Sequence, residues 1–217
     1  MSSFHEHIIQ CPSCGAAGTF TVWDSVNTEI SPGLRERVLD GSLFRWVCPE
    51  CGHAWTICSP MLYHAMDRHF MIHFQPRPEG HGAEEKEEPL GRRLMDAVGK
   101  AAGGMYTAHS HDELVEKILI HESDFDERGI EYSKYLLFKE TAPDGKIPQD
   151  GVLRYAGRCY SPRYGEDELD FIYVVNGEQE WGTCIPLSMY KHAMRDPEKV
   201  RRCSNYRTFR ETNPEEA

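Results

Sequence analysis

Two copies of a short cysteine motif constrain this chain more than any other feature of its sequence. The motif reads Cys-Pro-x-Cys-Gly and occurs at residues 11–15 and again at 48–52. Proline holds φ near about −65° inside the turn and glycine accepts a positive φ, so each motif predicts a tight turn that directs two thiols to one side. Two such turns supply the ligands of a tetrahedral zinc site. The sequence therefore predicts a metal site made of Cys11, Cys14, Cys48 and Cys51.

The two Cys-x-x-Cys pairs are separated by 33 residues, from Gly15 to Val47, a wider gap than the roughly 15–20 residues of common four-cysteine zinc sites. The segment between them explains the difference, because it contains a strand pattern at 19–23, a helix pattern from Ser31-Pro32 to Gly41 and a strand pattern at 43–47. We expect the ion to be Zn²⁺, the more available metal. An iron centre of the rubredoxin type would use the same four ligands.

The main alternative is a thiol-disulfide oxidoreductase, because Cys-Pro-x-Cys also occurs in redox enzymes. There the motif opens a helix, whose N-terminus lowers the pKa of the thiol. Here each motif is followed by glycine and then by β-type residues, at 19–23 and 54–58. A site with four cysteine ligands also leaves no coordination position open for water. We therefore expect a structural metal site and no catalytic residues.

Two capping patterns predict helices in the middle of the chain. Ser110 with Glu113, and Asp124 with Glu127, have the spacing of capping boxes and precede apolar positions at helical intervals. The helices are expected near 111–121 and 125–138.

The residues after Pro143 have the pattern of β-structure. Strands are expected at 152–160 and 169–175, followed by an Asn176-Gly177 pair typical of a type I′ hairpin turn. The expected fold class is α+β: a zinc-ribbon-like four-cysteine site expanded into a small antiparallel sheet, two capped helices and a β-rich C-terminal part. We expect domains at 1–140 and 141–217, with a linker-like insertion rich in Pro, Gly and Glu at 76–106.

The order of these motifs resembles the bacterial and archaeal CpXC family. Besides the paired cysteine turns, the resemblance includes Gly41-Ser42-Leu43-Phe44, Pro60-x-Leu62-Tyr63-His64 and Met71-Ile72, and it extends through the helical part to about residue 138. It implies a metal-binding domain built on the four cysteines. It implies no particular activity.

Three histidines and the four cysteines outside the motifs could each be either functional residues or residues that only pack in the fold. His64, His69 and His73 lie close enough in sequence for a second metal site, although packing beside the ribbon is the interpretation we favour. The four cysteines outside the motifs are expected to be small buried hydrophobic residues rather than reactive groups. These are Cys58, Cys159, Cys184 and Cys203.

The segment 191–210 differs in charge from the rest of the chain. It holds seven basic and two acidic residues, with Tyr190, Tyr206 and Phe209 interleaved, so it could dock nucleic acid or an acidic protein, or pack against the chain itself. The formal charge of the whole chain is −11, which disfavours nucleic acid as a general partner. We expect a protein partner or another copy of the chain.

The sequence contains no stretch of apolar residues long enough to span a membrane. Its first residues lack the basic and apolar regions of a signal peptide. The cysteines are too few and too widely spaced for a secreted disulfide framework. Cytoplasmic localisation is therefore expected.

Overall fold

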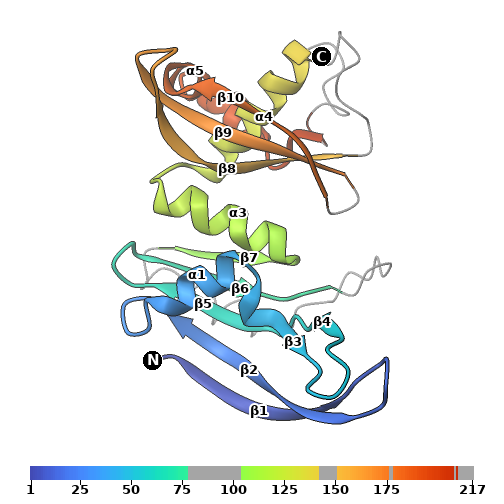
Figure 1. Cartoon of the computed structure of the whole chain (residues 1–217). Helices are drawn as coiled ribbons and strands as arrows, with labels where there is room; N and C mark the ends of the chain where they lie inside the picture. The colour runs from blue at the N-terminus through green and yellow to red at the C-terminus, as the bar shows by residue number, and fades with distance from the viewer. Residues whose placement is uncertain (78–103, 142–150, 176–177, 208, 210–217) are drawn as a thin grey trace. The chain divides into compact units, whose positions relative to one another are not determined.

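The computed structural model describes residues 1–77, 104–141, 151–175, 178–207 and 209. Within these ranges the chain contains helices and separate small sheets, so the predicted α+β class is confirmed (Figure 1). The chain divides into two compact units, residues 1–115 and 116–217, and the division falls within helix α3 (His111–Glu122). The domains predicted at 1–140 and 141–217 concern independent folding, and they stay a prediction.

The first unit contains a five-stranded sheet with the strand order β1-β2-β5-β6-β7. Two of its pairings, β2 with β5 and β6 with β7, are parallel, so the sheet is mixed rather than antiparallel throughout. Both parallel pairings join strands that lie far apart in the chain, and local sequence patterns do not encode them. The strands are β1 (Ser3–Gln10), β2 (Ala17–Asn27), β5 (Met61–Ala65), β6 (Phe70–Phe74) and β7 (Met105–Ala108).

A short helix and a hairpin lie between β2 and β5 in the chain. Helix α1 (Gly33–Leu39) is followed by Gly41, whose φ of 75° confirms the predicted left-handed helix end. A 3₁₀ turn, η1 (Ser42–Phe44), then leads into the antiparallel pair β3 (Arg45–Val47) and β4 (Ala54–Thr56). Most of the predicted linker, 76–106, lies outside the described residues, and its last two residues begin β7.

Helix α3 begins at His111, where the sequence predicts a helix to begin. The N–H of Glu113 donates to Ser110 Oγ over 3.2 Å, as expected for a cap. The Glu113 carboxylate accepts in return from the N–H of His109 rather than from that of Ser110. His111 also contacts the end of α1, with its Nε2 2.6 Å from the carbonyl oxygen of Val38.

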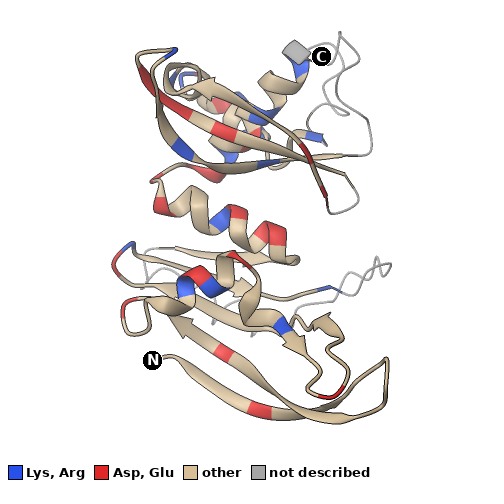
Figure 2. Ribbon diagram, viewed as in Figure 1, with Lys and Arg blue, Asp and Glu red and all other residues tan. Residues whose placement is uncertain are grey.

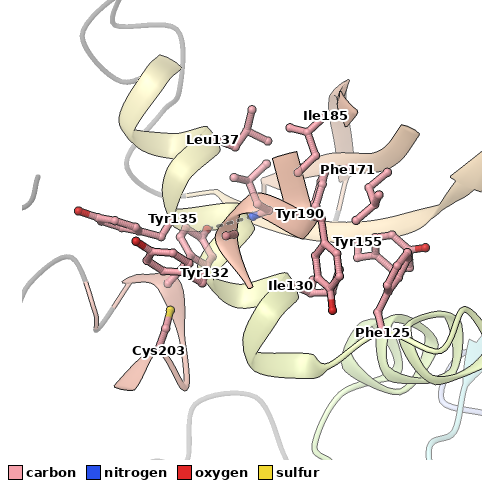
Figure 3. Packing of buried hydrophobic residues seen from close by; sticks show 14 of the residues in the cluster. Phe125, Ile130, Tyr132, Tyr135, Leu137, Tyr155, Phe171, Ile185, Tyr190 and Cys203 are labelled. Carbon is pink, nitrogen blue, oxygen red and sulfur yellow. Dashed lines mark hydrogen bonds between the residues drawn. The ribbon is translucent and has the colours of Figure 1, made fainter. Parts of the chain in front are cut away.

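The second unit contains an antiparallel sheet with the strand order β10-β9-β8, and helices that contribute to one apolar core. Figure 3 shows aromatic side chains of this core, among them Phe125, which precedes α4, Tyr155 and Phe171 from the sheet and Tyr190 from α5. The elements are α4 (Glu127–Thr141), β8 (Val152–Ser161), β9 (Glu166–Val175), β10 (Glu178–Pro186), α5 (Leu187–Ala193) and α6 (Pro197–Arg202).

The start of α4 differs from the sequence prediction. Helix α4 begins at Glu127, and the N–H of Gly129 donates to the Asp126 carboxylate, so the predicted cap at Asp124 is two residues too early. Glu127 instead forms an ion pair with Lys117 and lies within hydrogen-bond distance of the His121 ring, at 2.8 Å from Nε2. The predicted Asn176-Gly177 turn lies outside the described residues.

The aromatic residues of the basic C-terminal segment belong to the core of this unit. Tyr190, Tyr206 and Phe209 are buried, and the Phe209 ring packs edge-on against that of Tyr135 at 5.0 Å between ring centroids. The hydroxyl of Tyr206 accepts from the N–H of Leu153 over 3.0 Å. Of the two interpretations of the segment, its described part fits packing against the chain itself.

A buried charge network lies beside this core. The side chain of Lys134 is 2 % exposed, and its Nζ lies 2.6 Å from Glu116 Oε1 and also contacts Glu131. Glu116 accepts in addition from the Arg154 guanidinium at 2.9 Å and from the N–H of Tyr155 at 2.7 Å. A buried carboxylate is costly unless it is paired and hydrogen-bonded, and Glu116 meets both conditions.

The network predicts acid sensitivity of the second unit. Burial raises the pKa of Glu116, but Lys134 and Arg154 outweigh burial and hold that pKa below its ordinary value of 4.5. The folded state therefore gains stability from this carboxylate above pH 4.5 and loses the gain as the pH falls through the lowered pKa. We expect Glu116→Gln to lower the free energy of unfolding by about 3–5 kcal/mol at neutral pH.

The measurement is urea unfolding of wild type and Glu116→Gln over a pH series. The difference between the two proteins should shrink as the solution is acidified, because wild type alone loses the carboxylate. Glu180→Gln, at an exposed position of β10, is the control and should follow wild type. A difference that stays constant down to about pH 3 would contradict the assignment.

Candidate metal centre

The two cysteine motifs form turns with the same backbone hydrogen bonds. In the first, the N–H of Cys11 donates to Ala16 O at 2.8 Å and the N–H of Gly15 donates to Cys11 O at 2.9 Å. In the second, Cys48 and Gly52 occupy the equivalent positions, with distances of 2.9 and 3.0 Å. Both glycines have positive φ, 75° and 71°, as the motif predicts. The first turn joins β1 to β2, and the second joins β3 to β4.

The turns bring all four predicted cysteines together. Their sulfur atoms lie within 4.8 Å of one another, with 3.6 Å between the sulfurs of Cys11 and Cys51 and 3.7 Å between those of Cys14 and Cys48. A tetrahedral ion with metal–sulfur bonds of about 2.3 Å places its ligands about 3.8 Å apart. The four-cysteine cluster therefore has the size and the donor set of a metal-ion site.

The ionisation of the thiols also fits a cation. Burial raises the pKa of Cys11, but the N–H groups of Cys14 and Ser13 and two neighbouring thiols outweigh it and bring the pKa to about 6. The N–H of Ala16 lowers the pKa of Cys14, whereas the other thiols raise it to about 12. A divalent ion bound among the sulfurs would favour the thiolate form of its ligands.

The exposure of the cluster is uneven. Cys11 and Cys48 are 3 % and 1 % exposed and pack with Phe20 and Trp46 in a small apolar cluster. Cys14 and Cys51, the second cysteine of each turn, are exposed. One side of the sulfur cluster therefore faces the interior of the unit and the other faces solvent.

Trp46 provides a second attachment between the two hairpins. Its ring packs against Gly18 of β2, and its Nε1 donates to the carbonyl oxygen of Thr19 over 3.2 Å. A Cβ on Gly18 would lie only 2.6 Å from the Trp46 ring. The close approach requires glycine at position 18, a role that the sequence analysis missed because it depends on contact with a distant residue.

The family described as CpXC protein matches residues 9–134, more than half of the chain. The chain belongs to the CpXC family. The match contains the four-cysteine cluster and ends within α4, so β8, β9 and β10 follow the CpXC region. No curated protein and no solved structure matches the chain.

The histidines named in the sequence analysis lie apart from the CpXC cysteines. His64 is on β5 and His73 on β6, whereas His69 lies in the turn between these strands with a φ of 57°. Among the described residues, no group of potential metal ligands includes any of the three. Burial lowers the pKa of His64, so its ring is favoured in the neutral form.

The four cysteines outside the motifs differ from one another. Cys203 is buried, as predicted, and burial raises its pKa to about 12. Cys58 and Cys184 are partly exposed. The prediction is wrong for Cys159, which is exposed and lies beside two carboxylates of β9.

None of the helices in the described ranges combines the length and apolar character needed to cross a bilayer.

The contact between Gly18 and Trp46 predicts a destabilising substitution outside the cysteines. Gly18→Ala places a methyl group against the indole ring, and we expect it to lower the free energy of unfolding by about 1–3 kcal/mol. Gly33→Ala is the matched control, because a Cβ there meets nothing within 4 Å. Thermal unfolding of the two variants with metal bound gives the comparison. Equal melting temperatures would contradict the packing role of Gly18.

Proposed function

We propose that the four-cysteine cluster binds one structural Zn²⁺ and that the first unit is a zinc-dependent protein-interaction module. The observation that carries the metal assignment is the convergence of four sulfur atoms at the spacing of tetrahedral ligands. Zn²⁺ prefers this ligand set, and with four thiolates it supplies folding free energy rather than chemistry. Cytoplasmic reducing conditions would keep the cysteines available.

The proposed interaction surface is strand β1, the terminal strand of the five-stranded sheet. Terminal strands carry backbone groups that can pair with another strand. β1 also exposes large apolar side chains, with Ile8 75 % and Phe4 57 % exposed. The first cysteine turn follows β1 directly, so ion binding would help to hold the strand in place. The partner would be another protein or a second copy of the chain.

Two alternatives have less support. For a thiol-disulfide oxidoreductase, the cysteine with the lowered pKa should be accessible, but Cys11 is buried and its motif joins two strands instead of opening a helix. For nucleic-acid binding through the C-terminal segment, Tyr190, Tyr206 and Phe209 would need to reach bases, and all three are buried.

Metal removal tests the structural role. We expect one Zn²⁺ per four-cysteine cluster and loss of folded structure in the first unit on chelation, because metal binding supplies on the order of 10 kcal/mol coupled to folding. Cys48→Ser should have the same effect, whereas Cys58→Ser, the control, should retain the metal. Elemental mass spectrometry and circular dichroism with chelator give the readout. Thiols that react fast with a thiol reagent before chelation would favour the redox alternative.

Charge substitution on β1 tests the interaction surface. If β1 pairs with another copy of the chain, Ile8→Lys should weaken self-association at least tenfold in sedimentation equilibrium, because the substitution places a charge on the proposed surface. Ile30→Lys is the control, since Ile30 is similarly exposed, at 61 %, and lies outside the strand. Equal association of both variants would contradict this surface. A wild-type monomer at every concentration would exclude self-pairing.

A further inference from the structure

A second group of potential metal ligands lies in the three-stranded sheet of the second unit, outside the CpXC region. Cys159 is on β8, and Glu168 and Asp170 are on β9. Cys159 pairs with Glu168 across the two strands, so their side chains lie on the same face of the sheet. Asp170 lies two residues further along β9, also on this face. Figure 2 shows acidic residues along β9.

A β-bulge in β8 turns the Cys159 side chain to this face. The pairing register shifts between Tyr155 and Gly157, and Gly157 has a φ of 152°. Tyr155 pairs with Phe171 on the buried face, whereas Gly157 pairs with Asp170 on the other face. Without the extra residue, strict alternation would direct Cys159 to the same face as Tyr155. The bulge therefore brings the thiol to the carboxylates.

The distances fit coordination of one ion. Cys159 Sγ lies 3.4 Å from Asp170 Oδ2 and 3.7 Å from Glu168 Oε1, and one donor atom from each residue lies within 4.8 Å of the others. Tetrahedral bonds of about 2.3 Å to sulfur and 2.1 Å to oxygen separate the two ligand atoms by about 3.6 Å. The group is thus the size of a site with one sulfur and two oxygen ligands.

The hydrogen bonds that Cys159 can donate do not account for both carboxylates at its sulfur. The single S–H proton of Cys159 serves one acceptor at a time, yet two carboxylates lie at its sulfur. A divalent cation would replace that proton and offset the repulsion between the carboxylates.

We propose that Cys159, Glu168 and Asp170 form a second divalent-metal site, of the zinc class, with three protein ligands. The mixture of thiolate and carboxylate donors suits Zn²⁺ or Co²⁺ and disfavours Mg²⁺ or Ca²⁺, which require oxygen ligands. Three protein ligands leave a fourth position open to water or to a small ligand. The site differs in this respect from the four-cysteine cluster.

Two neighbouring residues bear on the site. Cys184 of β10 pairs with Asp170, and its thiol is hydrogen-bonded to Glu168, but its sulfur is not part of the group of donor atoms within 4.8 Å. Arg163 lies close enough to help lower the pKa of Glu168, after the hydrogen bonds from Ser161 and Cys184. The arginine favours an ionised carboxylate, although its charge also opposes a cation.

Co²⁺ titration of the full chain tests the site. The four-cysteine cluster is first loaded with one equivalent of Zn²⁺, and a zinc-binding dye monitors whether that ion is released. We expect one further equivalent of Co²⁺ to bind without Zn²⁺ release and to produce a thiolate-to-cobalt charge-transfer band. Cys159→Ser should abolish the band and weaken Co²⁺ binding at least tenfold, and Asp170→Asn should weaken binding while retaining the band at saturation.

Cys184→Ser is the matched control, because it makes the same chemical change on the same face of the neighbouring strand. It should bind Co²⁺ within about twofold of wild type. Binding of no second equivalent by wild type would overturn the proposal, as would a band unchanged by Cys159→Ser. Equal loss in Cys184→Ser would overturn the three-ligand arrangement. Circular dichroism of each variant without Co²⁺ establishes that the second unit is folded.

Discussion

The convergence of two cysteine turns organises the first unit. Strands β3 and β4 have three residues each, and a two-stranded ribbon of that length is not stable by itself in water. It is held through the sulfur cluster at one end and through Trp46, the central residue of β3, which packs on Gly18 of β2. A cation bound among the four sulfurs would join the two cysteine turns and favour the thiolate form of its ligands. Folding of this region and ion binding are therefore expected to be coupled.

The second unit is stabilised by an apolar core. Its core is rich in tyrosine and phenylalanine, which cover large areas but bring hydroxyl groups that need partners. The hydroxyl of Tyr206 accepts a hydrogen bond from the N–H of Leu153, and the hydroxyl of Tyr190 accepts one from the N–H of Asp126. Apolar contacts have no preferred direction, whereas the ion pairs and hydrogen bonds of the buried Lys134 network do. The network therefore helps to fix the orientation of the elements around the core. This unit thus needs no shared ion to explain its packing.

The features predicted well from the sequence are those encoded by neighbouring residues. The cysteine turns depend on Pro and Gly within five positions, and the helix after Ser110 depends on a cap three residues before Glu113. The mixed strand order was not predicted, because the pairing of β2 with β5 is set by packing between distant segments. Cys159 was expected in the core because free cysteines are usually buried. The expectation failed because a bulge reverses the face on which the side chain lies, and the sequence around Gly157 gives only a weak signal for a bulge. Glu127 resembled a capping residue, but a tertiary ion pair determines its role.

The position of Glu116 has an evolutionary consequence. This residue of α3 and its partner Lys134 fall within the CpXC match, whereas its other partners, Arg154 and Tyr155, come after it. A shorter relative that ended with the matched segment would retain the Lys134 ammonium group. It would lack the Arg154 guanidinium and the N–H of Tyr155, which also contact the Glu116 carboxylate. Gain or loss of the C-terminal strands in this lineage should therefore be accompanied by substitutions at positions 116 and 134, since a half-satisfied buried charge is worse than an apolar pair. The boundary recognised by sequence similarity is not a boundary for this electrostatic network.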